Sequence, residues 1–135
     1  MAPSFESDDA MMAPLREWMH TLISFVQSDQ PDLTNRQMAI LLIVYLMDGP
    51  HTVRGLAARL KVSKPVVTRA LNTLGAIGYV RRQKDESDLR NIFVERTEAG
   101  HAFLREYAER ITASRAYANQ PRENHAGQGI RPTLE

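Results

Sequence analysis

The sequence contains no cysteine. This absence excludes disulfides, thiolate nucleophiles, cysteine-based redox sensing and zinc sites with cysteine ligands. A long hydrophobic run is also missing, because the longest one, residues 38–47, has about half of the ~20 residues that a membrane-spanning helix needs. The N-terminus is acidic and lacks the basic and apolar segments of a secretion signal. The sequence therefore predicts a soluble, cytoplasmic protein with no membrane partner.

Motifs of enzymes are absent as well. The sequence has no glycine-rich phosphate loop, no nucleophile motif and no spacing that would bring histidines and carboxylates together. The four histidines, His20, His51, His101 and His125, are too widely separated to be paired metal ligands. The adjacent acids at 8–9 and 85–86 are interpreted as solvated loop charges. We expect no enzymatic activity, no metal and no cofactor.

The chain has 135 residues, which is the size of one domain, and a formal net charge of only +1. This near-neutral total conceals an uneven distribution. Residues 1–53 hold two basic and seven acidic side chains, residues 54–96 hold ten basic and four acidic, and residues 97–135 hold five of each. A basic middle segment of this kind indicates a polyanionic partner for one face of the protein.

Two helices are expected in the N-terminal third. An apolar stripe with helical spacing follows Pro14, which suits the first turn of a helix. The stripe consists of Leu15, Trp18, Met19, Leu22, Ile23 and Val26. Further along, Thr34 and Gln37 have the spacing of a capping box, which predicts a central helix over residues 37–47 that ends at Asp48-Gly49-Pro50.

The basic segment has the pattern of two short helices followed by a hairpin. Thr52 caps a helix over 53–60, and Ser63 caps a second helix over 64–74 that ends at Gly75 and Gly78, with Val67, Leu71, Leu74 and Ile77 in the core. Residues 79–84 and 91–96 have strand character, and residues 85–90 form a polar tip between them. A last helix runs from residue 98 to about 118. Residues 1–13 and 119–135 are expected to be flexible, which leaves 14–118 as the folded domain.

This order predicts a mainly α (α+β) fold, a winged helix-turn-helix with a two-stranded β wing, flanked by N- and C-terminal dimerisation helices. In such a fold the second helix enters the DNA major groove and the wing follows phosphates or reaches the minor groove. Considered singly, each basic residue is more simply explained as part of a solvated face. The concentration of ten basic residues within residues 54–96 favours a DNA-binding surface instead. The predicted DNA-binding residues are Ser63, Lys64, Pro65, Thr68, Arg69, Asn72, Arg82, Lys84, Asp88 and Arg90.

The segments Leu56-Ala-Ala-Arg-Leu60, residues 66–80 (VVTRALNTLGAIGYV), Asp88-Leu-Arg90 and Arg96-Thr-Glu-Ala-Gly100 together resemble the multiple-antibiotic-resistance regulator (MarR) family of bacterial winged-helix repressors. The resemblance covers roughly residues 33–115. It implies a homodimer on a pseudopalindromic operator, with residues 64–74 in the major groove, Arg90 near the minor groove and Asp88 orienting that arginine.

The dimer interface is expected to pair the two apolar stripes of the flanking helices, and the alternative is that these stripes pack within their own subunit. The predicted dimerisation residues are Leu15, Trp18, Met19, Leu22, Tyr107 and Ile111. The resemblance also implies a possible small-molecule effector, with Trp18, His20, Tyr45 and His101 as candidate lining residues. The simpler interpretation makes Trp18 a packing anchor and the histidines ordinary surface residues.

The sequence thus predicts a homodimeric, sequence-specific regulator of transcription that binds double-stranded DNA. The resemblance to the MarR family implies a repressor, while the residues themselves leave the choice between repressor and activator open. The alternative from another class is a winged-helix module that docks on another transcription component. An exposed apolar wing would favour this alternative, whereas the wing of this sequence is charged.

Overall fold

The computed structural model describes residues 9–118 of the 135-residue chain. The described residues form two compact units, which we call the winged unit (residues 31–106) and the helical unit (residues 9–30 with 107–118). The elements are α1 (Asp9–Val26), α2 (Asn35–Leu46), β1 (His51–Thr52), α3 (Val53–Leu60), α4 (Lys64–Ile77), β2 (Val80–Lys84), β3 (Ile92–Arg96) and α5 (Glu98–Ala118). The segments 1–8 and 119–135, predicted to be flexible, lie outside the described residues.

The core of the winged unit lies between α2, α3 and α4. Ile40, Leu41 and Val44 of α2 are fully buried, which agrees with the prediction of a central helix. Val67, Leu71 and Leu74 of α4, again as predicted, and Leu56 of α3 are also buried, and α4 contacts both α2 and α3. Ile77 differs from the prediction, because it is only half-buried at the end of α4.

The starts of α2 and α3 follow the predicted capping chemistry. The Thr34 hydroxyl accepts from the Gln37 N–H at 3.1 Å, and the Gln37 side chain accepts from the Thr34 N–H at 2.9 Å. The capping box therefore opens α2 at Asn35, two residues before the predicted start. Thr52 caps α3 by accepting from the Gly55 N–H at 3.0 Å.

Helix α4 begins at Lys64 as predicted, but its N-terminal capping and its C-terminal end differ from the prediction. Ser63 occupies the N-cap position with extended backbone, but its side chain makes no capping hydrogen bond. At the other end the helix continues through Gly75 and stops at Gly78, whose φ of 90° lies in the left-handed region that glycine adopts readily. Gly75 does not break the helix, because one glycine costs only about 1 kcal/mol relative to alanine and the packing of α4 outweighs it.

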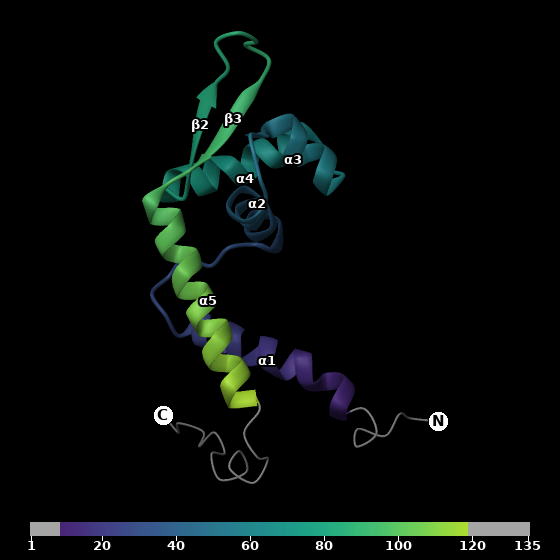
Figure 1. Cartoon of the computed structure of the whole chain (residues 1–135), viewed down its shortest axis with the longest axis vertical. Helices are drawn as coiled ribbons and strands as arrows, with labels where there is room; N and C mark the ends of the chain where they lie inside the picture. The colour runs from purple at the N-terminus through teal and green to yellow at the C-terminus, as the bar shows by residue number, and fades with distance from the viewer. Residues whose placement is uncertain (1–8, 119–135) are drawn as a thin grey trace, which may run out of the picture. The chain divides into compact units, whose positions relative to one another are not determined.

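The wing belongs to a three-stranded antiparallel sheet with the order β1-β3-β2. Strands β2 and β3 pair over their whole length, with Arg81 opposite Glu95 and Gln83 opposite Phe93. Beyond the expected two-stranded wing, β1 adds two residues to the other edge of β3. A two-residue strand has no periodicity that a sequence could reveal. Within the winged unit the β2–β3 hairpin extends beyond helices α3 and α4 (Figure 1).

Helix α1 begins at Asp9, five residues before the predicted start, so Pro14 lies inside it rather than in its first turn. Residues 9–13, predicted to be flexible, are helical. They include two alanines and two methionines, which are strong helix formers and carry the helix back past the proline.

The packing of α1 within the helical unit uses its polar face. Thr21 is buried and bonds to the Glu17 carbonyl, and Ser114 of α5 is buried and bonds to the Arg110 carbonyl. Arg110 donates to the Ser24 carbonyl at 2.9 Å, and the rings of Phe25 and Tyr107 lie 4.2 Å apart.

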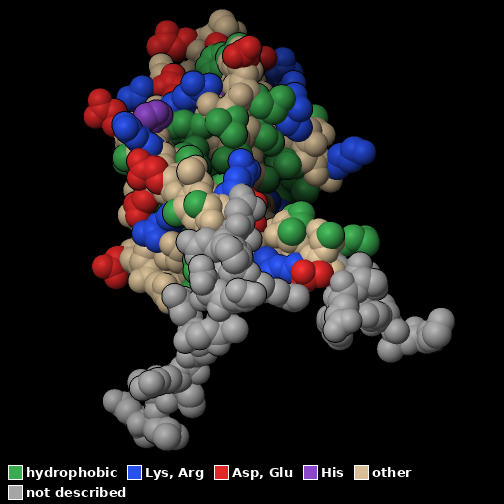
Figure 2. Space-filling model, turned by 60° about the horizontal axis from the view of Figure 1, so that its bottom comes forward, with side chains coloured by type: hydrophobic (Ala, Val, Ile, Leu, Met, Phe, Trp, Pro, Cys, Tyr) green, Lys and Arg blue, Asp and Glu red, His purple; other side chains and the backbone are tan. Residues whose placement is uncertain are grey.

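The apolar stripe of α1, by contrast, faces outward, with exposed fractions of 60% for Leu15, 43% for Trp18, 46% for Met19 and 41% for Leu22. Figure 2 shows one face of the molecule on which hydrophobic side chains reach the surface among charged ones. None of the helices within residues 9–118 combines the length and apolarity required to cross a membrane.

Candidate nucleic-acid interface

The outward face of α4 carries a row of polar and basic side chains. Burial of Val67, Ala70, Leu71 and Leu74 orients this helix, so that its opposite face looks to solvent. All of the predicted residues at this helix are exposed. They are Ser63, Lys64, Pro65, Thr68, Arg69 and Asn72.

The polar side chains of this face have no partners within residues 9–118. Among the described residues, Lys64, Arg69 and Asn72 make no hydrogen bond or ion pair, and neither does the hydroxyl of Ser63. The hydroxyls of Thr34 and Thr52 form the capping hydrogen bonds of α2 and α3. The Ser63 hydroxyl forms no such bond at the start of α4, so it can bond to another molecule. The face is therefore a set of donors that can bond to another molecule: an arginine can bind guanine in a bidentate manner, and an asparagine can bind adenine.

The basic residues of the wing fall into two classes. Arg81 donates to the Glu95 carboxylate across the strands at 2.7 Å, so its charge is balanced locally. Arg82 and Lys84, two of the predicted DNA-binding residues, are exposed and form no ion pair within the described part of the chain. The wing therefore presents Arg82 and Lys84 as its unbalanced cations along β2.

Hydrogen bonds shape the tip of the wing. The Asp88 carboxylate accepts from the backbone N–H of Arg90 at 3.1 Å and from its Nε at 3.3 Å. The contact to Nε restrains the Arg90 side chain, which is still 84% exposed. The Asp85 carboxylate accepts from the N–H and hydroxyl of Ser87 and from Asn91. The Ser87 hydrogen bonds hold the pKa of Asp85 below its usual value.

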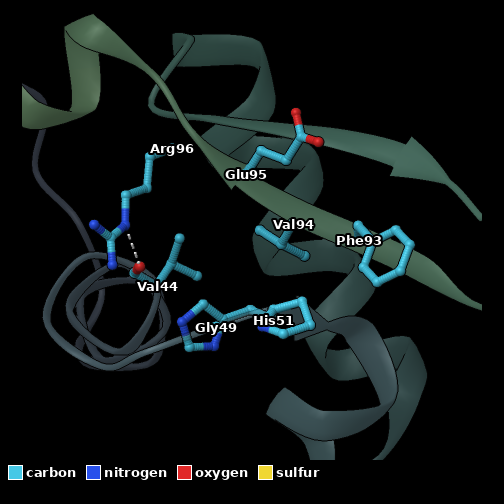
Figure 3. A pocket seen from close by; sticks show the side chains of 8 residues that line it. Val44, Gly49, His51, Phe93, Val94, Glu95 and Arg96 are labelled. Atoms are coloured by element: carbon cyan, nitrogen blue, oxygen red, sulfur yellow. Dashed lines mark hydrogen bonds between the residues drawn. The ribbon is translucent and has the colours of Figure 1, made fainter.

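Arg96, at the end of β3, has a structural role. Its Nε donates to the Val44 carbonyl at 2.8 Å and a terminal nitrogen donates to the Met47 carbonyl at 3.3 Å, which satisfies the C-terminal end of α2. Figure 3 shows this guanidinium beside a cavity of about 360 Å³ that is also lined by His51, Phe93 and Glu95. Arg96 is therefore not one of the free cations, although it belongs to the basic segment of the sequence.

Tyr45 joins three elements at the root of the wing. Its hydroxyl lies 2.8 Å from the Tyr79 carbonyl oxygen and 2.9 Å from that of Thr97, and accepts from the Thr97 N–H at 2.7 Å. The Thr97 hydroxyl donates to the Gly78 carbonyl and accepts from the Gly100 N–H. A Cβ at Gly100 would collide with the Tyr45 hydroxyl and the Tyr79 carbonyl. The Thr-Glu-x-Gly motif thus connects the wing to α5.

The candidate effector residues belong to two different units of the structure. Tyr45 and His101 line one cavity of about 570 Å³ in the winged unit, together with Leu46, Arg96, Leu104 and Arg105. Trp18 and His20 belong to the helical unit, where the Trp18 ring lies 6.5 Å from that of Tyr107 and the His20 ring 4.2 Å from that of Tyr117. The described residues contain no cluster of three or more histidine and acidic side chains able to hold a metal.

A further groove lies between α2 and α4 and was not predicted. It has a volume of about 260 Å³. Its lining residues are Thr34, Arg36, Gln37, Val66, Arg69, Ala70 and Thr73. The sequence offered no signal for it, because Arg36 lies in the acidic N-terminal third and reaches α4 only through the packing of α2.

Comparison with known proteins identifies relatives for this architecture. Residues 33–92 match the model of the MarR family. No curated protein matches the sequence. Among solved structures, the transcriptional regulator Tm0710 from Thermotoga maritima is 26% identical, with 84% of this chain and 71% of that chain covered and a TM-score of 0.55.

Two further structures share the fold at lower identity. A mutant of MepR from S. aureus is 18% identical, with 94% of this chain and 92% of that chain covered and a TM-score of 0.66. Streptococcus pneumoniae FabT, solved in complex with DNA, is 18% identical, with 93% and 90% covered and a TM-score of 0.61. The match to the MarR model covers the helix-turn-helix and most of the wing, and the solved structures share the winged-helix fold of this chain.

Proposed function

We propose that this chain is a cytoplasmic, sequence-specific DNA-binding transcriptional regulator that represses its targets as a homodimer on a pseudopalindromic operator. The observation that carries the proposal is the outward face of α4, where Lys64, Arg69 and Asn72 are exposed and have no partner among the described residues. The DNA complex of FabT, which has the same fold, supports DNA as the partner.

The proposed interface has two parts with different tasks. Helix α4 reads base edges in the major groove through Arg69 and Asn72, with Ser63, Lys64, Pro65 and Thr68 at its first turns. The wing contacts phosphates through Arg82 and Lys84, and Arg90, held by Asp88, reaches toward the minor groove. Phosphate contacts release counterions, so affinity falls steeply as salt rises.

The exposed stripe of α1 supports the homodimer in this proposal. A helix that buries Thr21 while leaving Leu15, Trp18, Met19 and Leu22 in water is packed with its polar face inward. A second copy would cover this stripe, with Tyr107 and Ile111 of α5 contributing, across a two-fold axis. Such a dimer presents two α4 helices to half-sites spaced by about one turn of DNA.

Selection of genomic fragments tests the proposal. The purified protein is mixed with a fragment library, and bound DNA is sequenced. The proposal predicts enrichment of an inverted repeat whose half-sites are about 10 base pairs apart. Recovery of fragments without a shared motif would favour the alternative, a winged-helix module that docks on another transcription component.

The cavity that contains Tyr45 and His101 supports a second proposal, an effector site for a small anionic ligand. Arg96 and Arg105 supply positive charge, and Leu46 and Leu104 supply apolar walls. The probe is benzoate, and the readout is the thermal midpoint, which a ligand raises when it binds only the folded state. A midpoint that rises with benzoate for the wild type but not for Arg105→Ala supports the site, and an equal rise in both contradicts it.

A further inference from the structure

The groove between α2 and α4 contains two cations from different elements. Arg36 comes from the first turn of α2 and Arg69 from the middle of α4, and both line the same 260 Å³ groove. Neither side chain makes an ion pair or hydrogen bond within residues 9–118. Two like charges that converge without a carboxylate between them create a site with a positive potential that favours an anion.

The groove lies on a flank of α4, beside the face that is proposed to read DNA. Successive residues of a helix turn by about 100°. Val66, Ala70 and Thr73 therefore lie along one flank of α4, beside the outward face that carries Thr68 and Asn72. A helix seated in the major groove has a DNA backbone along each flank, so the groove faces a row of phosphates.

The first turn of α2 adds neutral donors to the same place. The capping box uses the N–H groups of Thr34 and Gln37. The N–H groups of Asn35 and Arg36 have no acceptor among the described residues. The Thr73 hydroxyl, on the opposite wall, has no hydrogen bond there either. Guanidinium, amide and hydroxyl donors together match the three-oxygen face of a phosphate.

We infer that Arg36 anchors a backbone phosphate of the operator in this groove, as a third contact outside the helix-turn-helix and the wing. The inference rests on the proposed DNA-binding function and extends it to α2. In this arrangement Arg36 contributes affinity without sequence preference, because phosphates are the same in every sequence.

The test compares three variants with the wild type on the selected operator and on a scrambled duplex, across a range of salt. Arg36→Gln removes the charge and Arg36→Lys keeps it. Arg115→Gln removes a cation of the helical unit that pairs with Glu17, as a control for the change in net charge. Loss of one phosphate contact lowers affinity by about eightfold at 0.1 M salt and reduces the salt slope by about 0.9. We expect this for Arg36→Gln on both duplexes, and near wild-type behaviour for the other two variants.

The contacted phosphate is identified by neutralising single phosphates as methylphosphonates. At one position in each half-site, neutralisation should weaken the wild type but not weaken Arg36→Gln further, as expected for two groups in direct contact. An unchanged salt slope for Arg36→Gln, or additive losses at every phosphate, would overturn the inference. If the wild type itself fails to bind DNA, the proposed function fails instead, so the two failures are distinguishable.

Discussion

At the scale of single residues, the hydroxyl of Tyr45 holds the wing root, the end of α4 and the start of α5 together. A tyrosine hydroxyl can donate one hydrogen bond and accept others. That of Tyr45 lies within hydrogen-bonding distance of the carbonyl oxygens of Tyr79 and Thr97 and accepts a hydrogen bond from the N–H of Thr97. None of these partners is adjacent in sequence, so the sequence carried no signal of this connection, and the family resemblance implied only that Tyr45 lines an effector site.

Tyr45→Phe should therefore destabilise the protein by about 1–3 kcal/mol, because it leaves backbone groups without a partner. Gly100→Ala should cost more, since its methyl group would occupy the place of the Tyr45 hydroxyl. Urea denaturation followed by circular dichroism measures both. A Tyr45→Phe midpoint equal to that of the wild type would show that water replaces the hydroxyl at no cost.

Asp85 provides a second prediction at this scale. Hydrogen bonds from Ser87 lower the pKa of Asp85 from 3.8, so the charged carboxylate stabilises the folded wing tip. This contribution is present above the unfolded value and is lost as the pH falls through the lower folded pKa. Ser87→Ala should raise the pKa of Asp85 toward its ordinary value. Carbon-13 NMR titration of the carboxyl group measures the shift, and an unchanged pKa would contradict this role of Ser87.

At the scale of elements, α4 and the wing divide the work of binding. Helix α4 places Arg69 on its exposed face, within reach of base edges, whereas β2 carries Lys84 on an exposed strand near the tip of the hairpin. Within the winged unit the wing projects beyond α3 and α4 (Figure 1), which suits contact with the DNA backbone.

We expect Arg69→Ala to relax base preference at one operator position, with a loss of about 1–3 kcal/mol against the preferred base. Lys84→Ala should weaken binding to all sequences about equally and reduce the salt slope by about 1. Competition binding with single-base operator variants separates the two effects. Equal losses of selectivity in both variants would refute this division of tasks.

Most helices of the winged unit could be predicted because their signals are local. The capping residues Thr34 and Thr52, and the apolar spacing of α3 and α4, fix these elements within a few residues of chain. Strand β1 could not be predicted, since its two residues become a strand only by pairing with β3. The structural role of Arg96 and the groove at Arg36 could not be predicted for the same reason. The carbonyls that Arg96 binds and the α4 residues that line the groove with Arg36 are distant in sequence.

At the scale of the whole molecule, the distribution of charged residues along the chain is more informative than the small net charge. The acidic first third contributes α1, whose outward stripe is apolar, and the basic segment contributes α3, α4 and the wing. The proposed dimer uses the first for self-association and the second for DNA.

Leu22→Glu and Ile111→Glu, introduced together, should convert the dimer into monomers, because charges would be buried at the two-fold interface. Thr112→Glu, a change on the exposed surface of α5 next to Ile111, serves as the control and should remain dimeric. Light scattering coupled to size exclusion gives the mass of each variant. A double variant that stays dimeric would show that the stripe is not the interface.

The central claim, sequence-specific recognition of DNA, is tested most directly by a binding isotherm on the selected operator and on a scrambled duplex at 50 and 200 mM salt. We predict a dissociation constant of about 10⁻⁸ M or tighter for the operator, at least about 10³-fold weaker binding to the scrambled duplex, and a steep loss of affinity at the higher salt. Equal affinity for both duplexes, or no binding to either, would contradict the claim.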